Sequence, residues 1–164
     1  MTPEQIAVVQ ESFQRVATIA DQAAELFYQH LFLLDPELKS LFPSDMHAQG
    51  KKLVQMIGLA VHRLNSPETL IPAVQELGRR HRAYGVEEKD YDTVGQALLW
   101  TLEQGLGADF TPQVQEAWCA TYQLLAETMK QAAHSNAQAA QHYVVHARHG
   151  KQYGDSTRSA IHVM

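Results

Sequence analysis

Apolar side chains recur every three or four residues through most of the chain, which is the spacing of amphipathic helices. The first such stripe consists of Ile6, Val9, Phe13 and Val16. It follows a typical start signal, in which Thr2 is an N-cap, Pro3 occupies the first turn and Gln5 stands where a capping box needs it. Further helices are expected over residues 20–34, 46–64, 67–82, 88–106 and 111–133, with a short helical turn over 36–42.

Turn-forming residues separate these stretches. The second helix is expected to end at Asp35, because the residue before a proline (Pro36) is disfavoured in the helical region. Gly105, Gly107 and then Pro112 separate the last two helices. No stretch alternates apolar and polar residues as a half-buried strand would, and no internal repeat is found. The pattern therefore predicts an all-α fold of six or seven helices.

Composition narrows the class of protein. With 164 residues, 45% of them apolar and 19% charged, the chain has the size and content of one globular domain. No apolar run approaches the roughly 20 residues of a membrane helix, and no secretion signal opens the chain. A single cysteine, Cys119, excludes an intrachain disulfide, and a net charge of −5 argues against nucleic acid as a partner. We expect a soluble, cytoplasmic protein.

Residues 134–164 differ from the rest. They hold five of the nine histidines, and their charge of +2 leaves −7 for residues 1–133. We expect a C-terminal tail that is flexible or partly helical, with a helix around Ala137–Ala147. His142, His146 and His149 have the spacing of one helical face and raise the alternative of a metal site. The absence of an acidic or cysteine ligand beside them favours a solvated tail.

The helix expected over 67–82 carries a candidate ligand. His81 shares a stripe with Val74 and Leu77, while Arg79, Arg80 and Arg82 occupy the other faces. A neutral imidazole facing the interior is suited to binding iron. The alternative is a core histidine that bonds to a backbone carbonyl.

Two other helices carry candidate pocket residues. Gly50 is costly inside a helix, so it suggests close approach by another helix, for which Ala24 is a suitable partner. Gln49 and Leu53 share the face next to it, and Tyr28 lies one turn after Ala24. A buried tyrosine can pack its ring and still donate a hydrogen bond. Each of these residues taken alone is also compatible with an ordinary core.

Their order and spacing resemble those of a known family. The chain is similar to bacterial single-domain globins of the Vitreoscilla type and to the haem domain of flavohaemoglobins, over about residues 4–130. The matching residues are Phe27-Tyr28, Asp35-Pro36-Glu37-Leu38-Lys39, Leu41-Phe42, Gln49 with Leu53, Leu70-Ile71-Pro72-Ala73-Val74, His81, Tyr91 with Val94-Gly95 and Leu98-Leu99, and Ala117-Trp118 with Tyr122.

The resemblance implies a globin fold over residues 1–133, in which a three-on-three helical sandwich encloses haem b. It implies that His81 is the proximal ligand of the iron, that Tyr91 lies on the same side, and that Tyr28 and Gln49 form the distal pocket with Leu53. The haem contacts implied are Phe42, Lys52, Leu53, Leu77, His81, Val86, Tyr91 and Val94. For Lys52, suggested as a propionate partner, a solvated side chain is an equal alternative.

The function implied is reversible binding of oxygen, NO and CO at a pentacoordinate haem iron. One alternative is a nitric oxide dioxygenase that depends on a separate reductase, because the Gly105-Leu106-Gly107 segment lacks the third glycine and the preceding strand of a dinucleotide site. Another is a haem-based gas sensor or a haem-free interaction module. One departure from the flavohaemoglobin pattern is Ala133, which stands where that pattern has a glutamate.

The positions of the other histidines around their helices predict whether they face the pocket. His30 and His47 each stand two residues from a pocket candidate, and His62 points away from the direction of Gln49. All three are expected at the surface. Cys119 is expected to be an inert small side chain.

Overall fold

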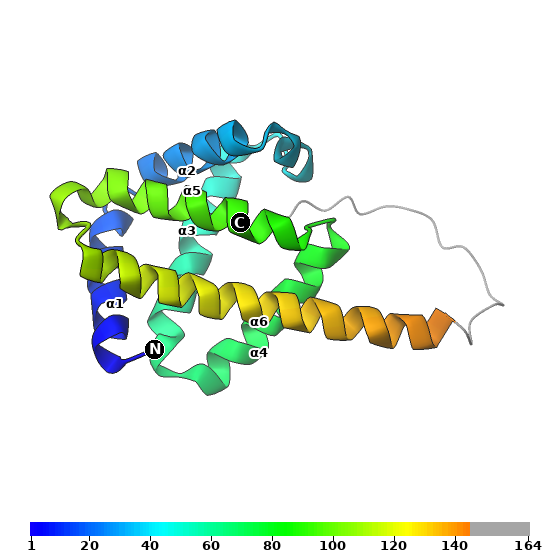
Figure 1. Ribbon diagram of the computed structural model, residues 1–164. Helices are drawn as coiled ribbons and strands as arrows, with labels where there is room; N and C mark the ends of the chain where they lie inside the picture. Colours follow the sequence, from blue (N-terminus) through cyan, green and yellow to red (C-terminus); the bar gives the residue numbers. More distant parts are fainter. Residues whose placement is uncertain (145–164) are drawn as a thin grey trace.

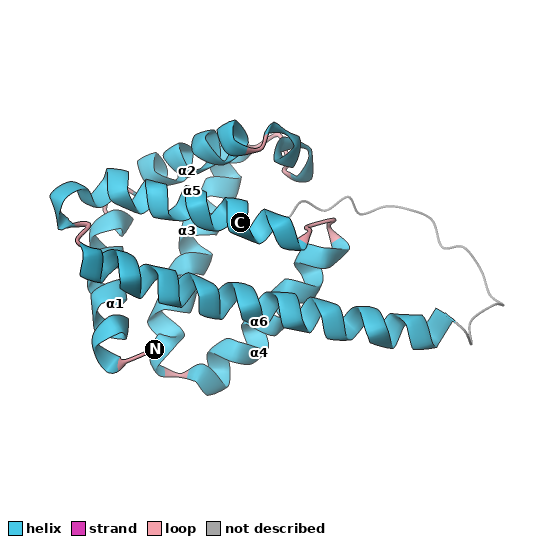
Figure 2. Ribbon diagram, in the orientation of Figure 1, coloured by secondary structure: helices cyan, strands magenta, loops and turns pink. Residues whose placement is uncertain are grey.

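The computed structural model describes the backbone of residues 1–144 and the side chains of residues 1–135. Every regular element in that part is helical, as Figure 2 shows. In chain order the elements are α1 (Pro3–Ala17), α2 (Ala20–Leu34), η1 (Pro36–Leu41), α3 (Met46–His62), η2 (Arg63–Asn65), α4 (Pro67–Ala83), α5 (Glu88–Leu106), η3 (Gly107–Asp109) and α6 (Pro112–Val144). The all-α prediction is confirmed. Among the described residues, no helix combines the length and the apolarity needed to cross a membrane.

The first helix begins as its sequence predicts. The backbone N–H of Gln5 donates to the Thr2 hydroxyl over 3.1 Å, and the Thr2 N–H donates to the Gln5 side chain over 3.0 Å. These reciprocal bonds form a capping box that satisfies donors left open at a helix start. Sequence alone therefore located this helix boundary correctly.

The last helix runs further than its pattern predicts. The expected end at Ala133 is wrong, because α6 continues to Val144 without a break. Residues 134–144 contain no glycine or proline and three alanines, so nothing in that segment interrupts a helix. The helix expected around Ala137–Ala147 is thus the continuation of α6 as far as Val144. The side chain of His142, and all of His146 and His149, lie outside the described residues, so the metal alternative for the tail stays untested.

Two groups of helices build the core (Figure 1). In one, α4 crosses α6, and in the other α2 packs against both α5 and α3. The helix α1 contacts α6 and α3 and so closes the end of the molecule where α6 begins. The buried Ser12 of α1 accepts a hydrogen bond of 2.8 Å from Trp118 of α6, which joins these two helices inside the core.

Glycines allow close helix crossings at two places. A Cβ added at Gly78 of α4 would lie 2.4 Å from the backbone oxygen of Met129 in α6, so the two backbones touch there. A Cβ at Gly50 of α3 would lie 2.9 Å from the Cβ of Ala24 in α2. The predicted close approach of Gly50 and Ala24 is therefore confirmed. These two crossings position the helices that carry the candidate site residues.

Candidate functional site

His81 lies near the C-terminal end of α4, with 1% of its surface exposed. Its Nδ1 is 2.7 Å from the backbone oxygen of Leu77. Because a carbonyl oxygen can only accept, Nδ1 carries the hydrogen, and in the neutral imidazole Nε2 carries the lone pair. This is the bond expected of a core histidine, and it is equally the bond by which metal-binding histidines are oriented. The bond therefore prepares Nε2 to bind a metal without showing that it does.

Tyr28 and Gln49 face each other across the crossing of α2 and α3. Tyr28 follows Ala24 by one turn and is 5% exposed, while Gln49 precedes Gly50 and is 1% exposed. Burial raises the pKa of the Tyr28 phenol well above its usual range, and a hydrogen bond with Gln49 opposes part of that rise. The hydroxyl consequently stays protonated at neutral pH and can act as a donor.

Aromatic rings hold Tyr28 in place. The centroid of its ring lies 5.0 Å from that of Phe27, 6.0 Å from that of Phe32 and 5.3 Å from that of Phe42. The Phe27 and Phe42 rings meet it edge-on, an arrangement that aromatic pairs favour. Phe42, expected as a cofactor contact, is thus half-buried beside the distal candidate.

An apolar cavity lies between the helices that carry the other candidates. Its volume is about 90 Å³, and Leu53 of α3, Leu77 of α4 and Val94 of α5 line it together with residues of α6. A smaller cavity, of about 10 Å³, is bordered by Phe42, Val86 and Val94. Pockets for cofactor-sized ligands typically measure about 300–1,000 Å³, so the lining side chains must move if a large apolar group enters.

Tyr91 and Lys52, both expected to contact the cofactor, differ in burial. Tyr91 of α5 is 4% exposed, and its backbone oxygen accepts a hydrogen bond from the Tyr122 hydroxyl of α6. Burial, assisted by the charge of Asp90, raises the pKa of Tyr91 to about 12. Lys52 of α3 is half-buried. This exposure is compatible both with a propionate partner and with a solvated side chain.

The remaining histidines are placed largely as expected. His47 and His62 are exposed. His30 is half-buried rather than fully exposed, because its ring stacks on Trp100 with centroids 4.0 Å apart and planes 4° apart. Cys119 is a free, half-buried thiol. Within the part of the chain that the structure describes, no three His, Cys, Asp or Glu side chains gather into a metal-binding group.

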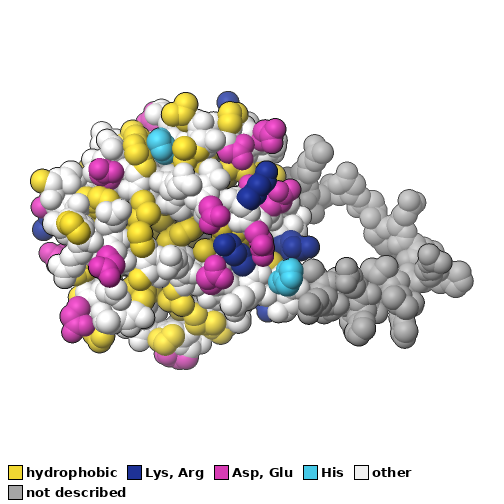
Figure 3. Space-filling model, viewed as in Figure 1, with side chains coloured by type: hydrophobic (Ala, Val, Ile, Leu, Met, Phe, Trp, Pro, Cys, Tyr) yellow, Lys and Arg dark blue, Asp and Glu magenta, His cyan; other side chains and the backbone are white. Residues whose placement is uncertain are grey.

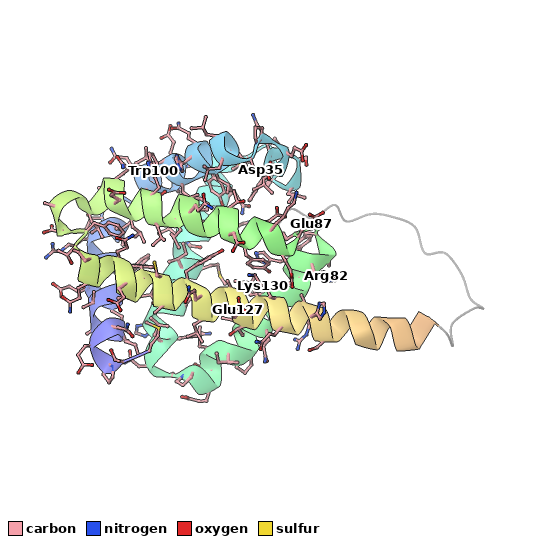
Figure 4. The ribbon with its side chains drawn as sticks, in the orientation of Figure 1. Asp35, Arg82, Glu87, Trp100, Glu127 and Lys130 are labelled. Carbon is pink, nitrogen blue, oxygen red and sulfur yellow. The ribbon has the colours of Figure 1, made fainter. Side chains whose placement is uncertain are left out.

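Sequence reasoning missed one charged residue near these candidates. The ammonium of Lys130 lies 5.7 Å from the centroid of the Tyr91 ring (Figure 4). Lys130 adjoins the buried stripe of Ala126, Met129 and Ala133, so its place at the edge of that stripe is the signal that could have found it.

The chain is similar to several known proteins. The family model described as Globin matches residues 25–129. The flavohemoproteins of Vibrio cholerae and Rhodopirellula baltica are 28% and 29% identical over 130 residues, which cover 77% of this chain and 33% and 32% of theirs. The chain thus spans about a third of the length of these curated relatives. A solved hexacoordinated heme protein from an anhydrobiotic tardigrade shares the fold, with a TM-score of 0.75, 15% identity and coverage of 82% of this chain and 96% of that one.

Proposed function

Because the chain belongs to the globin family, we propose that it binds haem b and, through it, the diatomic gases oxygen, NO and CO. The observation that carries the proposal is His81, a buried imidazole whose Nδ1 is committed to the Leu77 carbonyl. That bond leaves Nε2 as the atom able to bind iron. The flavohemoprotein relatives supply independent support for a haem group.

The side chains that line the two apolar cavities suit a large apolar cofactor. Leu53, Leu77 and Val94 would contact its faces from three different helices, with Phe42 and Val86 at the neighbouring cavity. Lys52 would pair with a propionate. Haem, when bound, would supply an iron able to bind a diatomic ligand. The apolar walls would exclude water from the site, which strengthens any hydrogen bond formed there.

The Tyr28 hydroxyl is the proposed donor to the ligand, and the Gln49 amide orients it. A ligand with partial negative charge gains most from a buried, protonated donor. The proposed iron is pentacoordinate, because His47 and His62 are exposed and His30 is stacked on Trp100. None of these three imidazoles is therefore proposed as a second protein ligand. This expectation differs from the hexacoordinated state named for the tardigrade protein.

A second candidate function is nitric oxide dioxygenation, which the resemblance to flavohaemoglobins implies. That reaction oxidises the iron in each turnover and therefore requires an electron donor. The proposed donor is a separate reductase protein, and the proposed location is the cytoplasm. An NADH-driven assay of NO consumption, with and without cell extract, distinguishes a turning-over enzyme from a gas-binding protein. Absence of repeated turnover under every reductant would rule out the enzyme.

The primary test replaces the proposed ligand. We expect His81→Ala to abolish stable haem binding or to yield a ferrous-CO spectrum without the signature of an imidazole ligand. The exposed His62→Ala is the matched control and should leave the Soret band unchanged. An unchanged ferrous-CO spectrum in His81→Ala would refute the assignment. A wild-type protein that shows no Soret band after haem is added would refute haem binding and favour an interaction module.

A further inference from the structure

The ammonium of Lys130 lies against the ring of Tyr91, and the side chain is less exposed than is usual for a lysine. Its side chain is only 20% exposed, whereas lysines are mostly exposed in folded proteins. The ammonium lies over the Tyr91 ring, whose face attracts cations. Its ion-pair partner Glu127, at 3.5 Å, is 62% exposed and therefore well solvated. The Lys130 side chain is therefore less accessible to water than the Glu127 side chain that accompanies it.

Packing between helices determines where Lys130 sits. It follows Met129, whose backbone touches Gly78 of α4, and Gly78 precedes His81 by three residues. The Tyr122 hydroxyl donates to the Tyr91 backbone oxygen and so ties α6 to α5 at the residue beneath the ammonium. Figure 4 shows Lys130 where α6 passes the ends of α4 and α5. Lys130 therefore lies over Tyr91 of α5, one residue beyond the point where α6 touches α4, the helix that carries His81.

The other charged side chains described at this end of the molecule are either exposed or engaged in helix capping. Lys89 and Glu87 form an ion pair at 3.7 Å, and each side chain is 67% exposed. Arg82 is exposed as well, as Figure 3 shows for several basic side chains on this face. The buried carboxylate of Asp90 is engaged in capping α5, where it accepts a bond of 2.8 Å from the Glu87 N–H. Charges in full contact with water have little influence at a distance.

We propose that Lys130 maintains a positive electrostatic potential on the His81 side of the site and thereby favours ferrous over ferric haem. The inference rests on the proposed haem function. One-electron reduction removes one positive charge from the haem, so a nearby half-buried cation destabilises the ferric state more than the ferrous state. Reversible oxygen binding requires the ferrous state. Lys130 thus acts on the redox equilibrium and does not touch the ligand.

The test is the ferric/ferrous midpoint potential of the haem-loaded protein, measured by spectroelectrochemistry. We expect Lys130→Met to lower the potential and Lys130→Arg, which retains a cation that can lie over the ring, to restore it toward the wild-type value. The matched control is Lys89→Met, which changes the net charge equally but removes an exposed lysine, and it should leave the potential unchanged. Equal shifts in Lys130→Met and Lys89→Met, or no restoration by Lys130→Arg, would overturn the proposal.

Two further measurements distinguish misfolding and loss of haem from a change in the midpoint potential. Circular dichroism of the apoprotein shows whether Lys130→Met folds, and Lys130→Gln replaces it in the comparison if it does not. The Soret band of each variant reports haem binding separately from the potential. Normal haem binding with an unchanged potential would refute the role of Lys130 alone. Failure of the wild-type protein to bind haem would refute the proposed function and this inference with it.

Discussion

Replacing Gly78 with alanine should disrupt the crossing of α4 and α6. The added Cβ would meet three backbone atoms of Met129, at 2.4, 2.5 and 2.8 Å. Because backbone atoms cannot rotate away, the helices must separate by about 1 Å to restore ordinary contact. Overpacking of this kind costs about 1–3 kcal/mol, from which the gain of about 0.5–1 kcal/mol for replacing a helical glycine is subtracted. We expect a net loss of about 1–2 kcal/mol in the free energy of unfolding.

Gly105→Ala is the matched control. Gly105 lies within α5, where a Cβ would meet Ile19 at 3.4 Å and Val16 at 3.8 Å, both flexible side chains at ordinary contact distance. The same chemical change should therefore stabilise the protein by about 0.5–1 kcal/mol. The two variants should differ by about 2–3 kcal/mol, which corresponds to roughly 4–12 °C in Tm for a chain of this size.

Thermal and urea unfolding of the two variants measure that difference directly. Haem affinity supplies a second readout, because Gly78 precedes His81 by three residues and a displaced α4 would move the imidazole. We expect Gly78→Ala to weaken haem retention and Gly105→Ala to preserve it. Equal stability of the two variants would refute the argument that backbone contact at Gly78 determines how α4 and α6 pack.

Three further predictions follow from buried polar groups. Tyr28→Phe keeps the ring and removes the donor, so oxygen should dissociate about 10- to 150-fold faster, corresponding to roughly 1.5–3 kcal/mol, while CO dissociation changes little; an unchanged ratio of the two rates would make Tyr28 a packing residue only. Ser12→Ala removes the acceptor of the buried Trp118 N–H and should cost about 1–3 kcal/mol in urea unfolding, whereas a wild-type midpoint would contradict that role. Burial raises the pKa of Tyr91 to about 12 and also raises the pKa of Tyr122, so these tyrosines ionise first in the unfolded chain. Their contribution to the unfolding free energy should be constant below about pH 10 and fall from there toward pH 12. Urea titrations at pH 9 and pH 11 test this, and Tyr91→Phe should reduce the difference between them.

Local pattern was sufficient to predict much of the fold. The apolar period marked each long helix, and the Thr2 and Gln5 side chains marked the start of α1 as the structure has it. The same period indicated that His81 faces the interior, where it is 1% exposed. These features depend on residues within one or two helical turns, whose geometry is set by the backbone itself. Even the bond from His81 to the Leu77 carbonyl, one turn earlier, is of this local kind.

Contacts between helices required the tertiary structure. The sequence suggested Ala24 as the partner of Gly50, but it gave no sign that Gly78 would meet the backbone of Met129. It also gave no role to Lys130, whose ammonium reaches Tyr91, 39 positions earlier in the chain. The amphipathic period identifies which face of a helix is buried, whereas the partner and the axial position depend on how side chains from several helices fill one volume. The identities of the candidate ligand and donors were therefore readable from the sequence, while the charge and the close packing around them were decided by the assembly of α4, α5 and α6.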